Sequence, residues 1–160
     1  MGKIISKNIL KTVLDKEKKN NKTIVFTNGC FDILHRGHIR YLKKAKEYGD
    51  ILVVGLNSDS SVRAIKGDKR PVVPEKDRAE ILSSLNMVDY VVIFSETTPY
   101  DLIKLLKPDV LVKGADYRIS EIAGADIVKN GGGKIARIKL EKGLGTSEII
   151  KIISERYKRQ

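Results

Sequence analysis

Residues 23–42 read TIVFTNGCFDILHRGHIRYL, and this stretch decides the fold. Its first four residues form an apolar, β-branched run, which is typical of a strand buried on both faces of a parallel sheet. Asn28 and Gly29 then give a turn signal, and apolar residues recur at helical spacing from Ile33 onward. The polar cluster between them therefore lies where a strand ends and a helix begins. At this place open α/β sheets bind their ligands, and free helix N–H groups favour phosphate.

The only two histidines of the chain, His35 and His38, lie in this cluster and share the first turn of the expected helix. Gly37 between them lets a phosphate come close to the backbone. Ordinary capping and solvated positions around a helix start are one alternative. A facial metal site of Asp32 and both histidines, as in a metal-dependent hydrolase, is another. We favour phosphate binding over the metal site, because Asp32 precedes the helix start and the three side chains need not share a face.

The chain has 160 residues, which is enough for one domain with a good-sized core. We expect residues 1–160 to form that single domain, with residues 1–20 supplying an N-terminal helix and a connection. The formal charge of +11 raises the alternative of a basic nucleic-acid-binding domain. Much of the excess is Lys in short helical clusters interleaved with Glu, without aromatic platforms, which favours a solvated face. A basic pocket also suits a polyanion such as a nucleoside triphosphate.

Two further features indicate a cytoplasmic protein that binds neither a membrane nor nucleic acid. No apolar run approaches the roughly 20 residues that cross a bilayer, and the N-terminus lacks a signal-peptide core. The single cysteine, Cys30, excludes an internal disulfide and fits a reducing compartment. We interpret Cys30 as a small apolar filler beside the strand end and not as a nucleophile.

Strands and helices alternate along the rest of the chain, as in a doubly wound α/β sheet. Further strands are expected at 51–56, 89–94, 110–112 and 134–140. Helices are expected at 6–18, from 74 onward, across 100–106, over 119–130 and from 146 to the C-terminus, with Thr146 or Ser147 as the last cap.

Polar, glycine-bearing segments follow several of these strands and point to phosphate binding. Lys113, Gly114 and Asp116 follow the fourth strand, on the same edge of the sheet as Asn28. Lys66 belongs to an irregular, glycine-bearing loop that can fold over a phosphate as a lid. Arg78 is in the first turn of a helix and can face a triphosphate. Gly143, Thr146 and Ser147 form a glycine-rich approach to the last helix, which is a second phosphate cradle.

Five phrases carry a family resemblance: FTNGCFDILHRGHIRYL, VVGLNSDSSVRAIKGDKRP, FSETTPYDLI, PDVLVKGADY and GLGTSEII. In this order they resemble the adenylyltransferases of D-glycero-β-D-manno-heptose 1-phosphate, which belong to the cytidylyltransferase-like nucleotidylyltransferase superfamily. These enzymes make ADP-heptose for the inner core of lipopolysaccharide. The resemblance implies a three-layer α/β/α, Rossmann-like fold with a five-stranded parallel sheet in the order 3-2-1-4-5.

The resemblance also implies an activity and the residues that carry it. AMP would pass from ATP to a sugar 1-phosphate, with Mg²⁺ arriving mainly on the triphosphate and not on a protein metal site. Catalytic roles would fall to His35, His38 and Lys66. The nucleotide would be bound by Thr27, Asn28, Gly29, Phe31, Asp32, Gly37, Arg78, Lys113, Gly114, Asp116, Gly143, Thr146 and Ser147. Superfamily members commonly pair, so a homodimer is expected, and a separate sugar kinase is implied.

Two departures from the family pattern leave the acceptor and the nucleotide open. The family tail is close to Glu-Gly-x-Ser-Thr-Thr, whereas residues 142–147 read KGLGTS, and KGADY replaces the more usual KGGDY. Glycerol-3-phosphate cytidylyltransferases and archaeal FAD synthetases share the histidine signature and are the alternative activities. The cytidylyltransferase tail, however, carries an Arg where this chain has Leu140.

Overall fold

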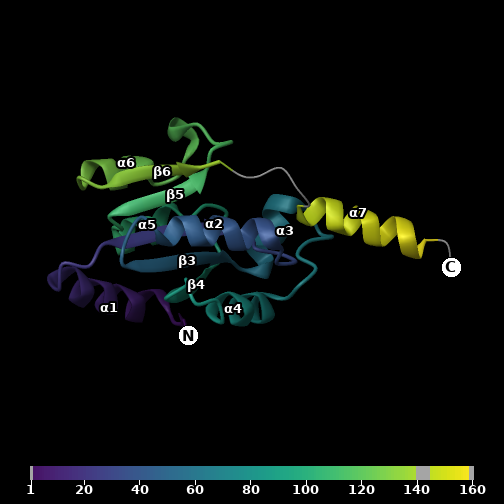
Figure 1. The fold of residues 1–160 in the computed structure, drawn as a ribbon, viewed down its shortest axis with the longest axis horizontal. Helices are drawn as coiled ribbons and strands as arrows, with labels where there is room; N and C mark the ends of the chain where they lie inside the picture. The colour runs from purple at the N-terminus through teal and green to yellow at the C-terminus, as the bar shows by residue number, and fades with distance from the viewer. Residues whose placement is uncertain (1, 140–144, 159–160) are drawn as a thin grey trace.

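The computed structural model describes residues 2–139 and 145–158, which form one parallel sheet with helices on both faces (Figure 1). Its strands lie in the order β1-β4-β3-β2-β5-β6, and every pair is parallel. The strands are β1 (Lys3–Ile4), β2 (Ile24–Gly29), β3 (Ile51–Asn57), β4 (Tyr90–Phe94), β5 (Val110–Gly114) and β6 (Lys134–Ile138). The helices are α1 (Lys7–Lys19), α2 (Arg36–Lys46), α3 (Asp59–Lys66), α4 (Glu75–Ser83), α5 (Tyr100–Leu106), α6 (Ala125–Asn130) and α7 (Thr146–Tyr157).

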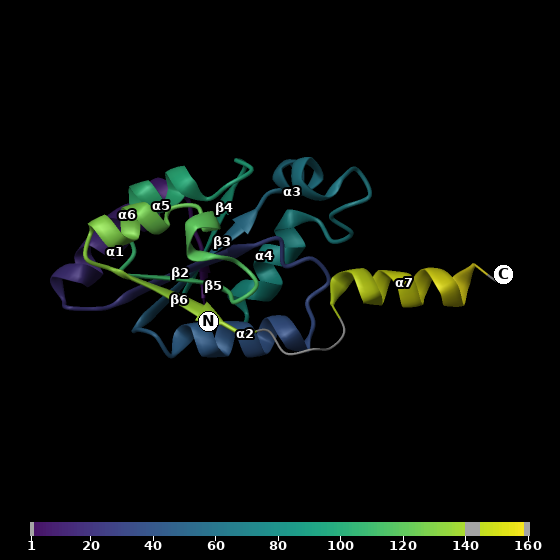
Figure 2. The ribbon, with the colours of Figure 1, turned by 90° about the horizontal axis from the view of Figure 1, so that it is seen from above.

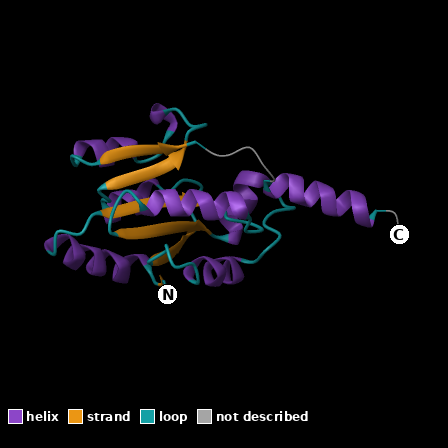
Figure 3. Ribbon diagram, viewed as in Figure 1, coloured by secondary structure: helices purple, strands orange, loops and turns teal. Residues whose placement is uncertain are grey.

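Two hydrophobic clusters lie one on each face of the sheet, between the strands and the helices that Figure 3 distinguishes by colour. Alternate residues of each strand feed opposite clusters, as the two-residue period of a strand requires. Helices α2 and α4 cover one face through residues such as Leu42 and Leu82. Helices α1, α5 and α6 cover the other through Leu10, Ile103 and Val128. Among the described residues, no helix is long and apolar enough to cross a bilayer.

The expected fold class and strand order are confirmed, and the strand count is corrected from five to six. The expected order 3-2-1-4-5 corresponds to β4-β3-β2-β5-β6. The additional strand, β1, pairs with the edge strand β4 through Lys3 and Ile4 alone. Two residues are too few to produce a periodic signal, so the sequence does not reveal this strand.

Two other elements also differ from expectation. Lys66 is the last residue of helix α3 and not part of an irregular loop, which begins at Gly67. The helix expected over 119–130 is instead a 3₁₀ turn (Ile119–Glu121) followed by α6. Gly124 separates them with a φ of 83°, and a Cβ there would lie 2.7 Å from Cδ1 of Ile103. The left-handed backbone and the close approach to α5 therefore interrupt the helix.

Helix α7 leaves the body of the domain and extends away from it (Figures 1 and 2). None of its residues is buried, so the apolar face expected at residues 149–153 covers no part of the described core. Its N-cap is Gly145 and not the expected Thr146 or Ser147, and Glu148 accepts a hydrogen bond from the Gly145 N–H at 2.7 Å. Residue 140 of the fifth expected strand and residues 142–144 of the tail lie outside the described residues.

The carboxyl ends of β2 and β5 lie at the switch point of the sheet, where open α/β sheets have an opening for ligands, here called the central crevice. The ladder between them pairs Val25 with Val110 and Phe26 with Leu111, whereas the β2–β3 ladder continues to Gly29. Tyr41 of α2 spans the opening: its hydroxyl lies 2.8 Å from Thr27 Oγ1 and donates to the Val112 carbonyl at 3.1 Å. Burial raises the pKa of Tyr41 to about 12, against a smaller opposing effect of the Thr27 hydrogen bond, so the hydroxyl keeps its proton.

The bridge made by Tyr41 predicts a stability effect. Tyr41→Phe removes one hydroxyl and leaves buried polar partners on both strands, so the free energy of unfolding should fall by about 1–2 kcal/mol in urea denaturation. Tyr48→Phe is the matched control, because Tyr48 is 46% exposed and its change should leave stability nearly unaltered. Equal effects of the two substitutions would contradict a structural role for the Tyr41 hydroxyl.

Candidate active site

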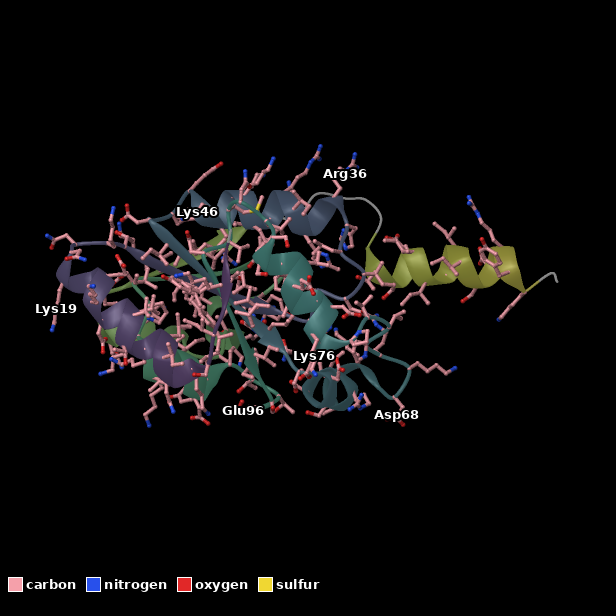
Figure 4. The ribbon with its side chains drawn as sticks, turned by 90° about the horizontal axis from the view of Figure 1, so that it is seen from below. Lys19, Arg36, Lys46, Asp68, Lys76 and Glu96 are labelled. Atoms are coloured by element: carbon pink, nitrogen blue, oxygen red, sulfur yellow. The ribbon has the colours of Figure 1, made fainter. Side chains whose placement is uncertain are left out.

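The two histidines lie together at the N-terminal end of α2, beside the crevice. His35 is the N-cap of the helix, and its Nδ1 accepts a hydrogen bond from the Gly37 N–H at 3.1 Å. The His35 and His38 rings lie against each other at a tilt of 31°, with centroids 3.9 Å apart, and the Phe31 and His38 rings make an edge-type contact with centroids 5.3 Å apart. Figure 4 shows the neighbouring Arg36 at the end of α2 nearest α7, with Lys46 at the far end.

The glycine between the histidines has a steric reason within the structure itself. A Cβ on Gly37 would lie 2.9 Å from Cε1 of His35 and 3.0 Å from its Nδ1. Real Cβ atoms essentially never come this close, so only glycine lets the His35 ring fold back over the helix start. With Nδ1 accepting, neutral His35 carries its proton on Nε2. The ring therefore presents an N–H donor.

Both histidines are held in the neutral state. Burial and, to a smaller extent, the proximity of His35 lower the pKa of His38 to about 4, against an opposing effect of Asp32. Burial also lowers the pKa of His35. Near neutral pH the pair therefore offers hydrogen-bond donors without positive charge. Among the described residues, Nδ1 of His38 and Oδ1 of Asn28 are buried polar atoms with no hydrogen-bond partner. Unsatisfied atoms of this kind concentrate where a ligand binds.

Asp32 anchors the loop that carries the histidines. One carboxylate oxygen accepts from Arg70 Nε at 2.6 Å and from the Val72 N–H at 2.9 Å, and the other accepts from the Val73 N–H at 2.9 Å. Burial alone would raise the pKa of Asp32, but these hydrogen bonds and the Arg70 charge outweigh it and lower the pKa. The carboxylate is thus occupied within the protein, and nucleotide binding by Asp32 stays a prediction.

Arg78 is a second anchor and is 2% exposed. Its guanidinium donates to three carbonyls and one carboxylate: Val73 at 2.8 Å, Cys30 at 2.6 Å, Asn57 at 2.9 Å and Asp59 at 2.7 Å. Four of its five N–H donors are therefore satisfied inside the protein. These hydrogen bonds join the ends of β2 and β3 to α3 and α4 through Arg78. Contact of Arg78 with a triphosphate stays a prediction.

The remaining candidates for phosphate binding differ in how closely they approach residues 30–35, here called the histidine loop. Thr146, the first residue of α7, donates its hydroxyl hydrogen bond to the Asp32 carbonyl at 2.6 Å, which brings the helix start beside the loop. Ser147 follows it and is exposed, as is Lys66 at the end of α3. Gly143 lies outside the described residues.

Residues at the end of β5 line the other side of the crevice. Gly114 is buried and pairs with Ile138 of β6, while Asp116 is exposed beyond the strand. Lys113 is half-buried, with Nζ 5.6 Å from the centre of the Tyr117 ring. Burial lowers the pKa of Lys113 to about 8, although Cys30 and Asp116 act in the opposite direction.

The described residues do not support the metal-site alternative or a reactive cysteine. No group of three or more His, Cys, Asp or Glu side chains in residues 2–139 and 145–158 is placed to hold a metal ion. Burial raises the pKa of the Cys30 thiol despite the nearby charges of Lys66, Arg78 and Arg70. Cys30 is therefore a protonated thiol at neutral pH, consistent with a packing role.

The comparisons with known proteins agree with this geometry. The model of the family described as cytidylyltransferase-like matches residues 26–150. The chain belongs to the cytidylyltransferase-like family. It is accordingly a nucleotidyltransferase, and the family resemblance of its sequence phrases is confirmed.

Two named relatives from curated proteins are called bifunctional protein HldE. The protein of Syntrophotalea carbinolica is 50% identical over 98% of this chain, and that of Helicobacter pylori strain J99 is 55% identical over 92%. These alignments cover 32% and 31% of the relatives, so the chain spans about a third of their length.

Solved structures share the fold. A lipopolysaccharide core biosynthesis protein from Thermoplasma volcanium is 30% identical, with a TM-score of 0.60 over 77% of this chain and 99% of that one. Pantoate-β-alanine ligase from Francisella tularensis has a TM-score of 0.65 over 100% of this chain and 80% of that one. At 18% identity, this second likeness shows the fold alone.

The structural role of Arg78 predicts a loss of stability on substitution. Arg78→Met leaves the Asp59 carboxylate and three carbonyls without their buried donor, so the free energy of unfolding should fall by about 3–5 kcal/mol. Arg63→Met is the control, because Arg63 is exposed on α3 and its loss should change stability little. Chemical denaturation measures both. An Arg78→Met protein with wild-type stability and only weakened ATP binding would show that Arg78 acts on the nucleotide instead.

Proposed function

We propose that the protein is an adenylyltransferase that transfers AMP from ATP to D-glycero-β-D-manno-heptose 1-phosphate. An oxygen of the sugar phosphate attacks the α-phosphorus of ATP and forms the new P–O bond. The bond from that phosphorus to the bridging oxygen of pyrophosphate breaks, and pyrophosphate leaves with the electron pair. ADP-heptose is the second product. The observation that carries this proposal is the pair of neutral, mutually contacting histidine rings at the N-terminus of α2, beside the β2–β5 crevice.

The histidine pair would stabilise charge on the reacting phosphate. Helix N-termini bind phosphate through free N–H groups and the helix dipole, and α2 offers such an end beside the crevice. His35 adds an Nε2–H donor, because its Nδ1 accepts the hydrogen bond from the Gly37 N–H. His38 lies against it and has an unsatisfied nitrogen. Donors fixed in advance stabilise developing charge without reorganising during the reaction.

Lys66, Thr146 and Ser147 would bind the rest of the triphosphate. Lys66 is exposed near the Cys30 end of the histidine loop, and α7 begins beside Asp32. We assign neutralisation of phosphate charge to Lys66, and the β- and γ-phosphates to the start of α7 with the Thr146 and Ser147 hydroxyls.

The donor set of the site fits Mg²⁺ that is bound mainly by the triphosphate. Mg²⁺ takes oxygen ligands and commonly uses few protein groups, and the buried carboxylate of Asp32 is already occupied. The ion would neutralise phosphate charge when ATP is bound. No general base is needed, because the attacking phosphate oxygen is already ionised and the reaction depends on positioning and charge stabilisation.

The choice of ATP and heptose 1-phosphate rests on the resemblance of the sequence to the ADP-heptose-forming branch. In that pathway a sugar kinase supplies the sugar 1-phosphate. We further propose that the protein works in the cytoplasm, where ATP and Mg²⁺ are available, and that it forms a homodimer. Light scattering of the purified protein tests the dimer.

The deciding experiment measures pyrophosphate release across a grid of substrates. ATP and CTP are each combined with heptose 1-phosphate, glycerol 3-phosphate and FMN, with Mg²⁺ present. Release with ATP and heptose 1-phosphate alone supports the proposal. Activity only with CTP and glycerol 3-phosphate would overturn the substrates and leave nucleotidyl transfer standing.

Substitution of the histidines tests the proposed chemistry. His38→Ala should lower kcat by about 10²–10⁴-fold with the fold intact, which is the scale for removing a donor to developing charge. His35→Ala should act similarly, and the double variant should lose less than the product of the two effects, because both side chains serve one charge. Steady-state kinetics and circular dichroism measure these changes. A His38→Ala enzyme with unchanged kcat would remove the pair from the chemistry.

A further inference from the structure

Lys113 is a cationic side chain beside the crevice, and the described residues supply no anionic partner for it. In residues 2–139 and 145–158, no hydrogen bond or ion pair holds its ammonium group, which lies over the Tyr117 ring. Arg137 of the neighbouring strand β6 is in register with Lys113 and donates to the backbone carbonyl of Tyr117 at 3.3 Å. Two cationic residues therefore occupy one edge of the crevice.

The charged and titratable groups around Lys113 do not neutralise it. Cys30 is a protonated thiol, because burial raises its pKa. Asp116 attracts the ammonium but is exposed to solvent, and Arg137 is itself positive. Burial without a paired anion disfavours the charged ammonium. An anion bound in the crevice would supply the missing interaction.

Lys113 belongs to the side of the sheet opposite the histidines. Val110 and Val112 of β5 pack in the cluster under α2, whereas Leu111 packs in the cluster under α5 and α6. Strand alternation therefore directs Lys113 to the α5–α6 side. Asn28 of β2 lies on this side too: a Cβ on Gly55 would meet both Phe26 Cζ, at 2.7 Å, and Asn28 Cβ, at 3.2 Å. Lys113 and the unsatisfied Asn28 oxygen thus both lie two residues beyond the last pair of the ladder between β5 and β2.

We propose that Lys113 binds the phosphate monoester of the acceptor substrate, across the crevice from the triphosphate. This inference rests on the proposed nucleotidyl transfer. It reassigns Lys113, which the family resemblance implied to be a nucleotide contact, to the second substrate. The reaction must bring two anions into contact, and the neutral donors at α2 serve only one of them. A lysine ammonium is a compact point charge that suits a single phosphate and lowers its repulsion from the triphosphate. The Asn28 oxygen can accept a hydrogen bond from an acceptor hydroxyl.

Kinetics with a length-matched apolar variant test this assignment. Lys113→Met should raise the KM for the acceptor by about 100-fold and leave the KM for ATP within about threefold. Lys134→Met is the control, because Lys134 is exposed at the amino end of β6, away from the carboxyl ends of the strands. It should change neither KM value. In the wild type, kcat/KM for the acceptor should fall above pH 8 as the ammonium loses its proton, by roughly tenfold per pH unit. Lys113→Arg should remove this fall, because guanidinium stays protonated.

Calorimetry gives a readout that does not depend on turnover or on the identity of the acceptor. Inorganic phosphate is titrated at pH 8.5 into protein saturated with Mg²⁺ and a non-hydrolysable ATP analogue, in two buffers of different ionisation enthalpy. The wild type should bind phosphate and take up a proton, and Lys113→Met should do neither. Unchanged phosphate binding in Lys113→Met, or a raised KM for ATP alone, overturns the inference. Lys113-dependent phosphate binding without pyrophosphate release from any acceptor overturns the proposed function and leaves the anion site.

Discussion

The buried carboxylate of Asp32 and the buried guanidinium of Arg78 hold the loop between β2 and α2, and the site depends on this loop. Phe31 and Ile33 in the loop have φ angles of 45° and 51°, a conformation that costs of order 1–3 kcal/mol for each residue that is not glycine. The Asp32 hydrogen bonds to residues 70–73 and the Arg78 bond to Cys30 counter that cost. The loop can then deliver His35 to the N-cap of α2.

The charged side chains that hold the loop differ from the side chains beside the crevice, and this difference explains the electrostatics of the site. Charged groups that hold the loop are paired with each other and with backbone atoms, so their charges are largely compensated. The histidines face the crevice but stay neutral, because burial lowers their pKa values. Uncompensated positive charge therefore comes from lysines, exposed Lys66 on one side and half-buried Lys113 on the other. A site arranged in this way attracts anions without forcing like charges together in the empty protein.

The sequence predicted what local patterns encode and missed what depends on distant contacts. The buried strand, the turn and the helix of residues 23–42 have distinct periodicities, so β2 and α2 were predictable, and the family resemblance supplied the strand order. The partners of Arg78 lie 5 to 48 residues away, and no spacing rule shows that its side chain turns inward. The same holds for Tyr41, whose partners are 14 and 71 residues away. A charged side chain in a first turn looks alike whether it binds a ligand or its own fold.

The crevice itself follows from the topology more than from any single residue. Strand β2 pairs with β3 on one side and β5 on the other, and the chain proceeds outward in both directions from this centre. The connections from β2 and β5 cover opposite faces of the sheet, since α2 packs on one and α6 on the other. In open α/β sheets such diverging connections leave a ligand crevice at the carboxyl ends, and here Tyr41 links the two strands beside it. Two anionic substrates can thus approach from the two faces of the sheet and meet at the carboxyl ends of β2 and β5. The sheet therefore positions the reaction, while residues in the loops select the substrates.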